Sequence, residues 1–279
     1  MKSFLSLISI LMVAFGLTAC GNVEELAQNN LYPLEFANKT KVPDSPPAGY
    51  QQELLVVQDS NVRFQVHLWS FRHSDEKAPV LIHFHGNGEN LGSLEKGGFL
   101  KKMETLGFSF VVFDYPGYGK STGVPTEASL MAASEATLRW TQIQFPNRPI
   151  YLWGWSIGTG PTTQMTVRHQ DRLKGAVLTS PFTSVRKMAK AKFSSLADQI
   201  PESWYQKNEW NSLAAAPQVR IPVLVQHGTK DQLIPFQMGR ELFESFPKAS
   251  SWFYASEGKG HGDVFQDPKI WDDLKNFVK

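Results

Sequence analysis

Three polar residues, far apart in the sequence, have the types needed for nucleophilic catalysis. The first is Ser156, within the segment Gly154–Gly158 (GWSIG), which fits the pattern G-x-S-x-G and follows an apolar run that begins at Ile150. This pattern is typical of a tight turn from a strand into a helix, which lifts the serine hydroxyl above the end of the strand. Glycine is needed on both sides because a Cβ there would collide with nearby backbone. We therefore predict that Ser156 is a nucleophile.

An acid and an imidazole follow at positions where two later strands are expected to end. Asp231 comes after the apolar run Pro222–Gln226, and His261 comes after Ser251–Tyr254. The carboxyl ends of parallel strands meet at one edge of a sheet, so all three side chains are expected at that edge. In a serine triad, His261 takes the proton of Ser156, and Asp231 holds His261 in the required tautomer.

Backbone N–H groups are expected to stabilise the negative charge that develops on the substrate oxygen. One is the N–H of Ile157, which directly follows the serine. A second is expected from Asn87 or Gly88, in the loop after the apolar run Pro79–Phe84, and the sequence leaves the choice between these two open. Loss of one such donor typically costs about 3–4 kcal/mol of barrier.

Neighbouring polar residues allow competing assignments. Asp263 is a rival acid, but it is only two residues from His261, too close for a partner on a separate loop. The competing role for Asp231 is to cap a helix. His83 and His85 alternate along a predicted strand and share a face, which is compatible with a metal pair, but no third ligand has a suitable spacing. We therefore expect neither a metal nor a cofactor.

The positions of strands and helices predict an α/β fold with a mostly parallel central sheet and helices on both faces. Two strands, Gln52–Gln58 and Arg63–Phe71, are expected to form an antiparallel hairpin. Helices are expected over Leu91–Leu106 and Glu127–Gln144, the latter just before the strand that leads to Ser156. The alternation of strands and helices is interrupted over residues 183–221, which we interpret as a small helical cap inserted into a domain that spans 51–279.

Five motifs fall in order between Pro79 and the C-terminus and resemble the α/β-hydrolase superfamily. They are His85–Asn90, Asp114–Gly119, Gly154–Gly158, Gly228–Asp231 and Gly260-His261. The most similar branch contains the small single-domain serine hydrolases that include protein depalmitoylases. The resemblance implies an α/β-hydrolase fold and hydrolysis of a carboxylic ester or thioester (EC 3.1) through an acyl-enzyme, with a lipid-like acyl substrate. A serine aminopeptidase acting on small peptides and a non-catalytic binding lipoprotein remain alternatives.

The N-terminus has the features of a secretory signal. Met1-Lys2 precedes the apolar run Phe4–Leu17, which is shorter than the about 20 residues that span a bilayer. Leu17–Cys20 (LTAC) resembles a bacterial lipobox, which implies a signal peptide over 1–19, cleavage after Ala19 and a lipid on Cys20. Residues 20–50, polar and rich in turns, are then expected to be a membrane tether and entry segment. The expected location is the bacterial cell envelope, with the outer membrane favoured and the domain facing the periplasm; a plain signal peptide or uncleaved anchor is the alternative.

Composition excludes some classes of partner. The chain has 279 residues, of which 42% are hydrophobic and 19% charged, and its formal net charge is +2. This nearly neutral charge, without a basic cluster, argues against nucleic-acid binding. A single cysteine cannot form a disulfide within the chain. The sequence does not predict the oligomeric state.

Overall fold

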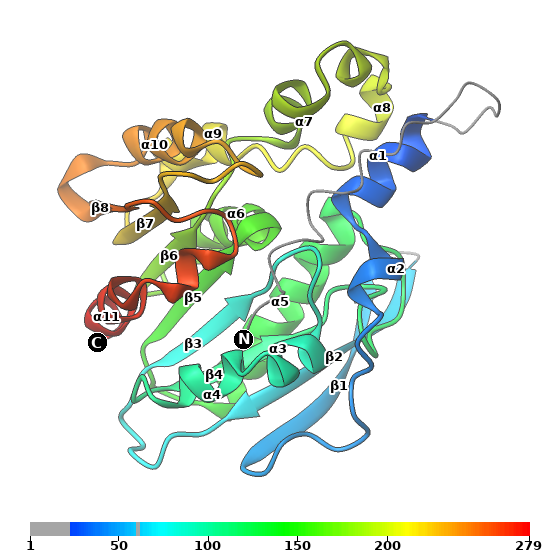
Figure 1. Ribbon diagram of the computed structural model, residues 1–279. Coiled ribbons are helices and arrows are strands. Elements are labelled where there is room, and N and C mark those ends of the chain that lie inside the picture. Colours follow the sequence, from blue (N-terminus) through cyan, green and yellow to red (C-terminus); the bar gives the residue numbers. More distant parts are fainter. Residues whose placement is uncertain (1–22, 60–61) are drawn as a thin grey trace.

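The computed structural model describes residues 23–59 and 62–279, and the described residues form one sheet of eight strands (Figure 1). The strands are β1 (Tyr50–Asp59), β2 (Val62–Phe71), β3 (Val80–Phe84), β4 (Ser109–Phe113), β5 (Ile150–Trp155), β6 (Gly175–Thr179), β7 (Val223–Gly228) and β8 (Ser251–Ser256). Their spatial order is β1-β2-β4-β3-β5-β6-β7-β8. β1 and β2 form the predicted antiparallel hairpin, β2 pairs antiparallel with β4, and the remaining pairs are parallel. The α/β-hydrolase fold expected from the sequence is thereby confirmed.

Helices pack on both faces of this sheet (Figure 1). The helices of the described residues are α1 (Val23–Leu31), α2 (Leu34–Ala37), α3 (Leu91–Lys96), α4 (Phe99–Glu104), α5 (Glu127–Gln144), α6 (Thr159–His169), α7 (Val185–Phe193), α8 (Glu202–Tyr205), α9 (Ser212–Ala215), α10 (Phe236–Ser245) and α11 (Pro268–Phe277), and α7 and α8 belong to the cap described below. Successive side chains of a strand point to opposite faces. In β4, accordingly, Phe110 and Val112 join the apolar cluster of α3, α4 and α11, while Val111 and Phe113 join that of α5 and α6. Both faces are buried, which explains the continuous apolar runs of the inner strands.

The helix expected over Leu91–Leu106 is divided into α3 and α4. The break lies at Gly97-Gly98, where Gly98 has a φ of +77°, a left-handed conformation that glycine adopts at little cost. In contrast, α5 has the bounds expected from the sequence. It begins after Thr126, whose side chain accepts the N–H of Ser129 and caps the first turn.

The N-terminal segment differs from the expected tether over 20–50. From Val23 onward it contains α1 and α2, and it buries Tyr32, Ala37 and Val42 against the domain. Burial of these apolar side chains offsets the cost of ordering the segment. The predicted signal peptide over 1–19 and Cys20 lie outside the described residues. Within 23–59 and 62–279, no helix has the length and apolar character needed to cross a bilayer.

The residues predicted to form a cap, 183–221, lie between β6 and β7. They contain α7, α8 and α9 together with short 3-10 turns. In Figure 1, α7 and α8 extend beyond the end of the sheet, on the side where α1 also lies. The cap is anchored on α6 through Trp210, a fully buried side chain whose ring lies 3.0 Å from where a Cβ on Gly160 would be.

Candidate active site

Ser156 occupies a strained turn between β5 and α6. Its φ is +55°, in the left-handed region that a residue with a Cβ seldom adopts. The flanking glycines permit this turn, because a Cβ on Gly154 would lie 2.4 Å from the carbonyl oxygen of Gly158, and one on Gly158 would lie 2.2 Å from that of Phe84. The turn is therefore packed directly against the end of β3, and the Ser156 side chain is held at the carboxyl edge of the sheet.

His261 comes from the loop after β8 and reaches Ser156. Its Nε2 lies 2.9 Å from the Oγ of Ser156. The imidazole stacks on the indole of Trp155, with ring centroids 5.5 Å apart and an angle of 28° between the planes. Trp155 is the variable residue of the G-x-S pattern, so the same turn that presents the serine also supports the base.

Asp231 lies in the loop after β7, and its carboxylate holds the other nitrogen of His261. Oδ2 of Asp231 is 2.7 Å from Nδ1 of His261, the shorter of the two hydrogen bonds that the imidazole makes. Oδ1 accepts the backbone N–H groups of Leu233 (2.9 Å) and Ile234 (2.8 Å), which fix the plane of the carboxylate. The structure thus brings together the three residues that the sequence singled out.

A second histidine supports the acid. Nε2 of His227, at the end of β7, lies 3.3 Å from Oδ2 of Asp231 and 3.0 Å from the carbonyl oxygen of Ile234. Burial by itself raises the pKa of Asp231, but the hydrogen bonds from His227 and His261 outweigh this effect and hold the pKa well below its usual range. The carboxyl group is therefore ionised at neutral pH.

The rival acid Asp263, and also Asp114, have other partners. Oδ1 of Asp263 accepts the N–H of Gly260 at 3.0 Å and shapes the loop that carries His261. Asp114, after β4, is completely buried and accepts the N–H of Leu91 at 2.8 Å, at the start of α3. Asp114 thus has a structural role at the turn after its strand.

The loop after β3 lies against the turn that carries Ser156. His85 begins this loop: its Nδ1 donates to the carbonyl oxygen of Gly86 (2.7 Å), and its ring stacks on Tyr115 with centroids 4.0 Å apart. The hydroxyl of Tyr115 donates to the carbonyl oxygen of His85 at 2.7 Å. Asn87 and Gly88 follow in the same loop. On the other side, Ile157 is in the first turn before α6, where N–H groups have no partner within the helix.

Glu89 also belongs to this loop, and its carboxyl group bonds to the backbone of the loop itself. Oε2 of Glu89 accepts the N–H of Gly86 at 2.9 Å. Burial raises the pKa of Glu89 to about 7, although the hydrogen bond from Gly86 acts in the opposite direction. Near neutral pH, the carboxyl group of Glu89 is therefore protonated in a substantial fraction of the molecules. The sequence carried no signal for this shift, which depends on the packing of the loop.

His83 of β3, like His85 just after it, is packed against aromatic rings. His83 is completely buried, with its ring centroid 4.5 Å from that of Trp153 and 4.9 Å from that of Phe99. Burial lowers the pKa of His83 to about 3, so it stays neutral. Within 23–59 and 62–279, no group of three or more His, Cys, Asp or Glu side chains is placed to hold a metal ion.

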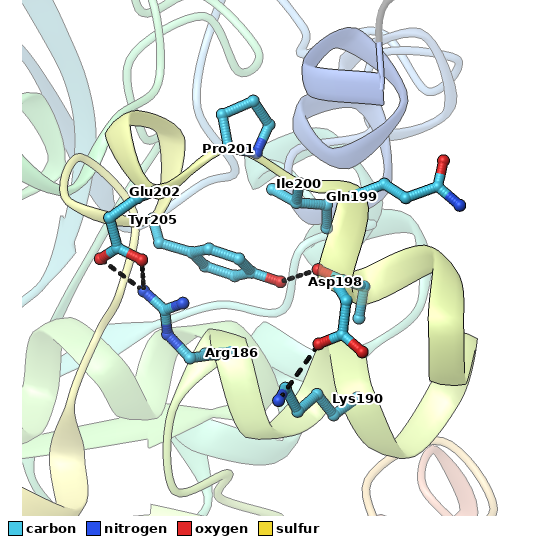
Figure 2. A pocket seen from close by; sticks show the side chains of 9 residues that line it. Arg186, Lys190, Asp198, Gln199, Ile200, Pro201, Glu202 and Tyr205 are labelled. Atoms are coloured by element: carbon cyan, nitrogen blue, oxygen red, sulfur yellow. Dashed lines mark hydrogen bonds and ion pairs between the residues drawn. The ribbon is translucent and has the colours of Figure 1, made fainter.

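A hollow of about 340 Å³ lies in the cap (Figure 2). Figure 2 shows its lining, in which Arg186 binds Glu202 at 2.8 Å and Lys190 pairs with Asp198 at 3.2 Å. The guanidinium of Arg186 also lies over the ring of Tyr205, 4.0 Å from its centroid. Because each cation already has an acidic partner, this hollow is an ion-paired part of the cap surface, and none of Ser156, His261 and Asp231 lines it.

Comparisons with known proteins bear on the family and the fold of the chain. Residues 79–209 match the family model of the α/β-hydrolase fold. The chain is 28% identical over 232 residues to a lysophosphatidylserine lipase, ABHD12, of Danio rerio, covering 76% of this chain and 61% of the relative. For the same lipase of Bos taurus, identity is 27% over 221 residues, covering 72% and 56%. The chain thus spans less than two thirds of the length of these relatives.

Solved structures show the same fold. The esterase Pf2001 of Pyrococcus furiosus superposes with a TM-score of 0.68 at 16% identity, covering 87% of this chain and 97% of that one. A cold-adapted esterase from an Arctic intertidal metagenomic library gives a TM-score of 0.61 at 20% identity, covering 88% and 99%. At these identities the likeness concerns the fold alone.

Proposed function

The chain is an α/β hydrolase by fold, and on this premise we propose that it is a serine hydrolase that cleaves carboxylic ester or thioester bonds (EC 3.1). One observation carries the proposal: His261 bridges the Oγ of Ser156, at 2.9 Å, and the Oδ2 of Asp231, at 2.7 Å. A nucleophile, a base and a residue that orients the base, within hydrogen-bonding reach of one another, are the requirements of acyl transfer.

In the proposed mechanism, Oγ of Ser156 attacks the carbonyl carbon of the substrate while Nε2 of His261 takes the hydroxyl proton. Asp231 stabilises the imidazolium and keeps its Nδ1 proton in place. The N–H of Ile157 and one from Asn87 or Gly88 bind the oxygen that becomes negative. His261 returns the proton to the departing alcohol or thiol, which leaves an ester on Ser156. Water, deprotonated by His261, then releases the carboxylic acid and restores the serine.

The substrate that we propose is an ester or thioester with a lipid-like acyl group. The relatives named as lysophosphatidylserine lipases support an ester of this kind. An aminopeptidase would require an acidic side chain to hold the free amine of a peptide, for which Glu89 and a glutamate of the cap are the candidates. The carboxyl group of Glu89 is engaged with the N–H of Gly86 and has a raised pKa, which argues against Glu89 as the residue that binds an amine.

We also propose that the enzyme is lipid-anchored in a bacterial cell envelope through Cys20, with its domain facing the periplasm. The support is the sequence LTAC at positions 17–20, which resembles a lipobox after a short apolar run. Growth with an alkyne-labelled fatty acid should label the wild-type protein and leave Cys20→Ser unlabelled. Equal labelling of both proteins would exclude Cys20 as the anchor.

The hydrolase proposal is tested with Ser156→Ala and a matched control, Ser180→Ala. Ser180 follows β6, is buried and also has a positive φ, of +51°, but it has no role in the proposed chemistry. Ser156→Ala should abolish both hydrolysis of a p-nitrophenyl ester and labelling by a fluorophosphonate, whereas Ser180→Ala should retain both. Unchanged turnover in folded Ser156→Ala would end the proposal. A series of acyl esters, acyl thioesters, a lysophospholipid and an amino-acid arylamide then identifies the bond and the acyl length.

A further inference from the structure

The N-terminal segment Asn30–Lys41 crosses the carboxyl edge of the sheet and contacts the loop that carries the second candidate oxyanion donor. Nδ2 of Asn87 lies 3.4 Å from the carbonyl oxygens of both Asn30 and Leu31. The ring of Phe36 covers Gly88 so closely that a Cβ on that glycine would lie 2.9 Å from it. The segment therefore contacts both residues whose N–H groups are candidates for binding the oxyanion.

The other end of this loop, at Asn90, is held by two hydrogen bonds to the N-terminal segment. Asn90 is completely buried, and its Nδ2 donates to the carbonyl oxygens of Ala37 (2.9 Å) and Thr40 (2.8 Å). Its Oδ1 accepts the N–H of Ser93 and caps α3. One side chain thus ties the N-terminal segment to the helix that follows the loop. Removal of Asn90 would leave buried backbone carbonyls without these donors, which is costly.

The segment is fixed independently at two other places. Asn38 accepts the N–H of Gly119 at 2.7 Å and donates to the carbonyl oxygen of Gly117 at 2.9 Å, in the loop after β4. The hydroxyl of Tyr32, a completely buried residue, accepts the indole N–H of Trp210 in the cap at 3.0 Å. Because it is anchored to the cap and to a second loop, the segment forms a rigid support for the loop after β3.

We propose that Asn30–Lys41 is a positioning element of the active site, with Phe36 as the residue that presses the loop of Asn87 and Gly88 into the geometry that binds the oxyanion. Oxyanion donors act only when they are held in place before the reaction, and a loop that contains glycines needs an external support. The inference rests on the proposed serine hydrolase function and extends it to residues that precede the sheet. Phe36 acts through the loop, so it is a positioning residue.

The test compares Phe36→Ala with Phe36→Leu, which keeps an apolar contact on Gly88, and with Ile143→Ala, which removes an exposed side chain of α5. The side chains of Phe36 and Ile143 are 48% and 68% exposed, so all three variants should fold. Each is assayed for kcat and KM on a p-nitrophenyl ester and for inhibition by an alkyl boronic acid. The boronic acid forms a tetrahedral adduct with Ser156 and places an oxygen in the oxyanion site, as the transition state does.

Phe36→Ala should lower kcat by roughly tenfold or more with little change in KM, since loss of a whole oxyanion donor costs about 10²–10³. The inhibition constant of the boronic acid should rise by a similar factor, and Phe36→Leu should recover most of both losses. Ile143→Ala should behave as wild type. A further variant, Asn87→Ala, keeps the backbone N–H but removes the side-chain contacts with Asn30 and Leu31. It should also lower kcat.

Two results would overturn this assignment. If kcat and boronic acid affinity stay at wild-type values in Phe36→Ala, the segment does not position the loop. If KM alone rises, Phe36 contacts the substrate directly. Ser156→Ala distinguishes these results from failure of the proposed hydrolase function. If the hydrolase proposal is wrong, the wild type itself shows no turnover that Ser156→Ala abolishes. If only the positioning role is wrong, the wild type keeps that turnover and Phe36→Ala matches it.

Discussion

Replacement of Asp231 by asparagine offers a sharp test, because the structure determines how the new amide must lie. Oδ1 of Asp231 accepts two backbone N–H groups, from Leu233 and Ile234, so the amide oxygen of asparagine will keep this position. The amide nitrogen then replaces Oδ2, which is 2.7 Å from Nδ1 of His261. The opposite orientation would place the NH₂ group against the N–H groups of Leu233 and Ile234, two backbone donors that cannot change their protonation, whereas the imidazole of His261 can change tautomer.

With an NH₂ group as its neighbour, Nδ1 of His261 must present a lone pair, and the imidazole proton moves to Nε2. Nε2 then points a proton at the Oγ of Ser156 and cannot accept the serine proton. In a serine triad this change of tautomer lowers kcat by about 10⁴. The loss corresponds to about 5 kcal/mol of barrier. The amide also faces the N–H of His227, which lies 3.3 Å from Oδ2 in the wild type, so we expect a further loss of about 1–3 kcal/mol of folding stability.

The assay is kcat on a p-nitrophenyl ester, with Ser156→Ala as the background and thermal unfolding to establish that the variant is folded. The matched control is Asp263→Asn, since Asp263 is close in sequence to His261 but accepts the N–H of Gly260 instead. We expect Asp231→Asn to lose about 10⁴ in kcat and the control to lose less than about tenfold. A folded Asp231→Asn that keeps a tenth of the wild-type kcat would refute the assignment of Asp231 as the residue that orients His261.

Three further substitutions, the first of them with a matched control, test the packing around the site. Gly158→Ala places a Cβ 2.2 Å from a backbone carbonyl oxygen and should abolish soluble folded protein, whereas Gly262→Ala, with nothing within 4 Å, should be tolerated; expression and circular dichroism distinguish them. The pKa of Glu89 is raised to about 7, so its folded form keeps a proton that the unfolded chain loses, and Glu89 lowers stability as the pH rises through 5–7. The free energy of unfolding of Glu89→Gln, measured in urea, should therefore rise by about 1–2 kcal/mol relative to that of the wild type between pH 5 and pH 8. This amount is reduced because the residue is partly exposed. A difference between the two proteins that does not change with pH would contradict the raised pKa. Tyr32→Phe leaves the buried indole N–H of Trp210 without its acceptor and should cost about 1–3 kcal/mol in the same measurement, while an unchanged midpoint would show that the contact carries no stability.

Local patterns in the sequence were sufficient to place the candidate nucleophile, base and acid. Each of Ser156, Asp231 and His261 follows a strand that is recognisable as a short apolar run bounded by turn residues. Parallel strands bring their carboxyl ends to one edge, so residues far apart in the sequence converge without knowledge of the detailed packing. The need for glycine on both sides of Ser156 was also predictable, because the close approach of backbone atoms at these positions is a property of the turn itself.

Tertiary packing decided the rest. The segment from Val23 to Lys41 is polar and rich in turns, and nothing in its pattern predicts that Tyr32 and Phe36 will lie against the cap and the loop after β3. The second donor to Asp231, from His227, and the raised pKa of Glu89 likewise arise from distances between side chains on different elements. Periodicity and turn chemistry act within a few residues and are visible in the sequence, whereas burial and electrostatic coupling depend on which segments meet, and that is known only once the chain has folded.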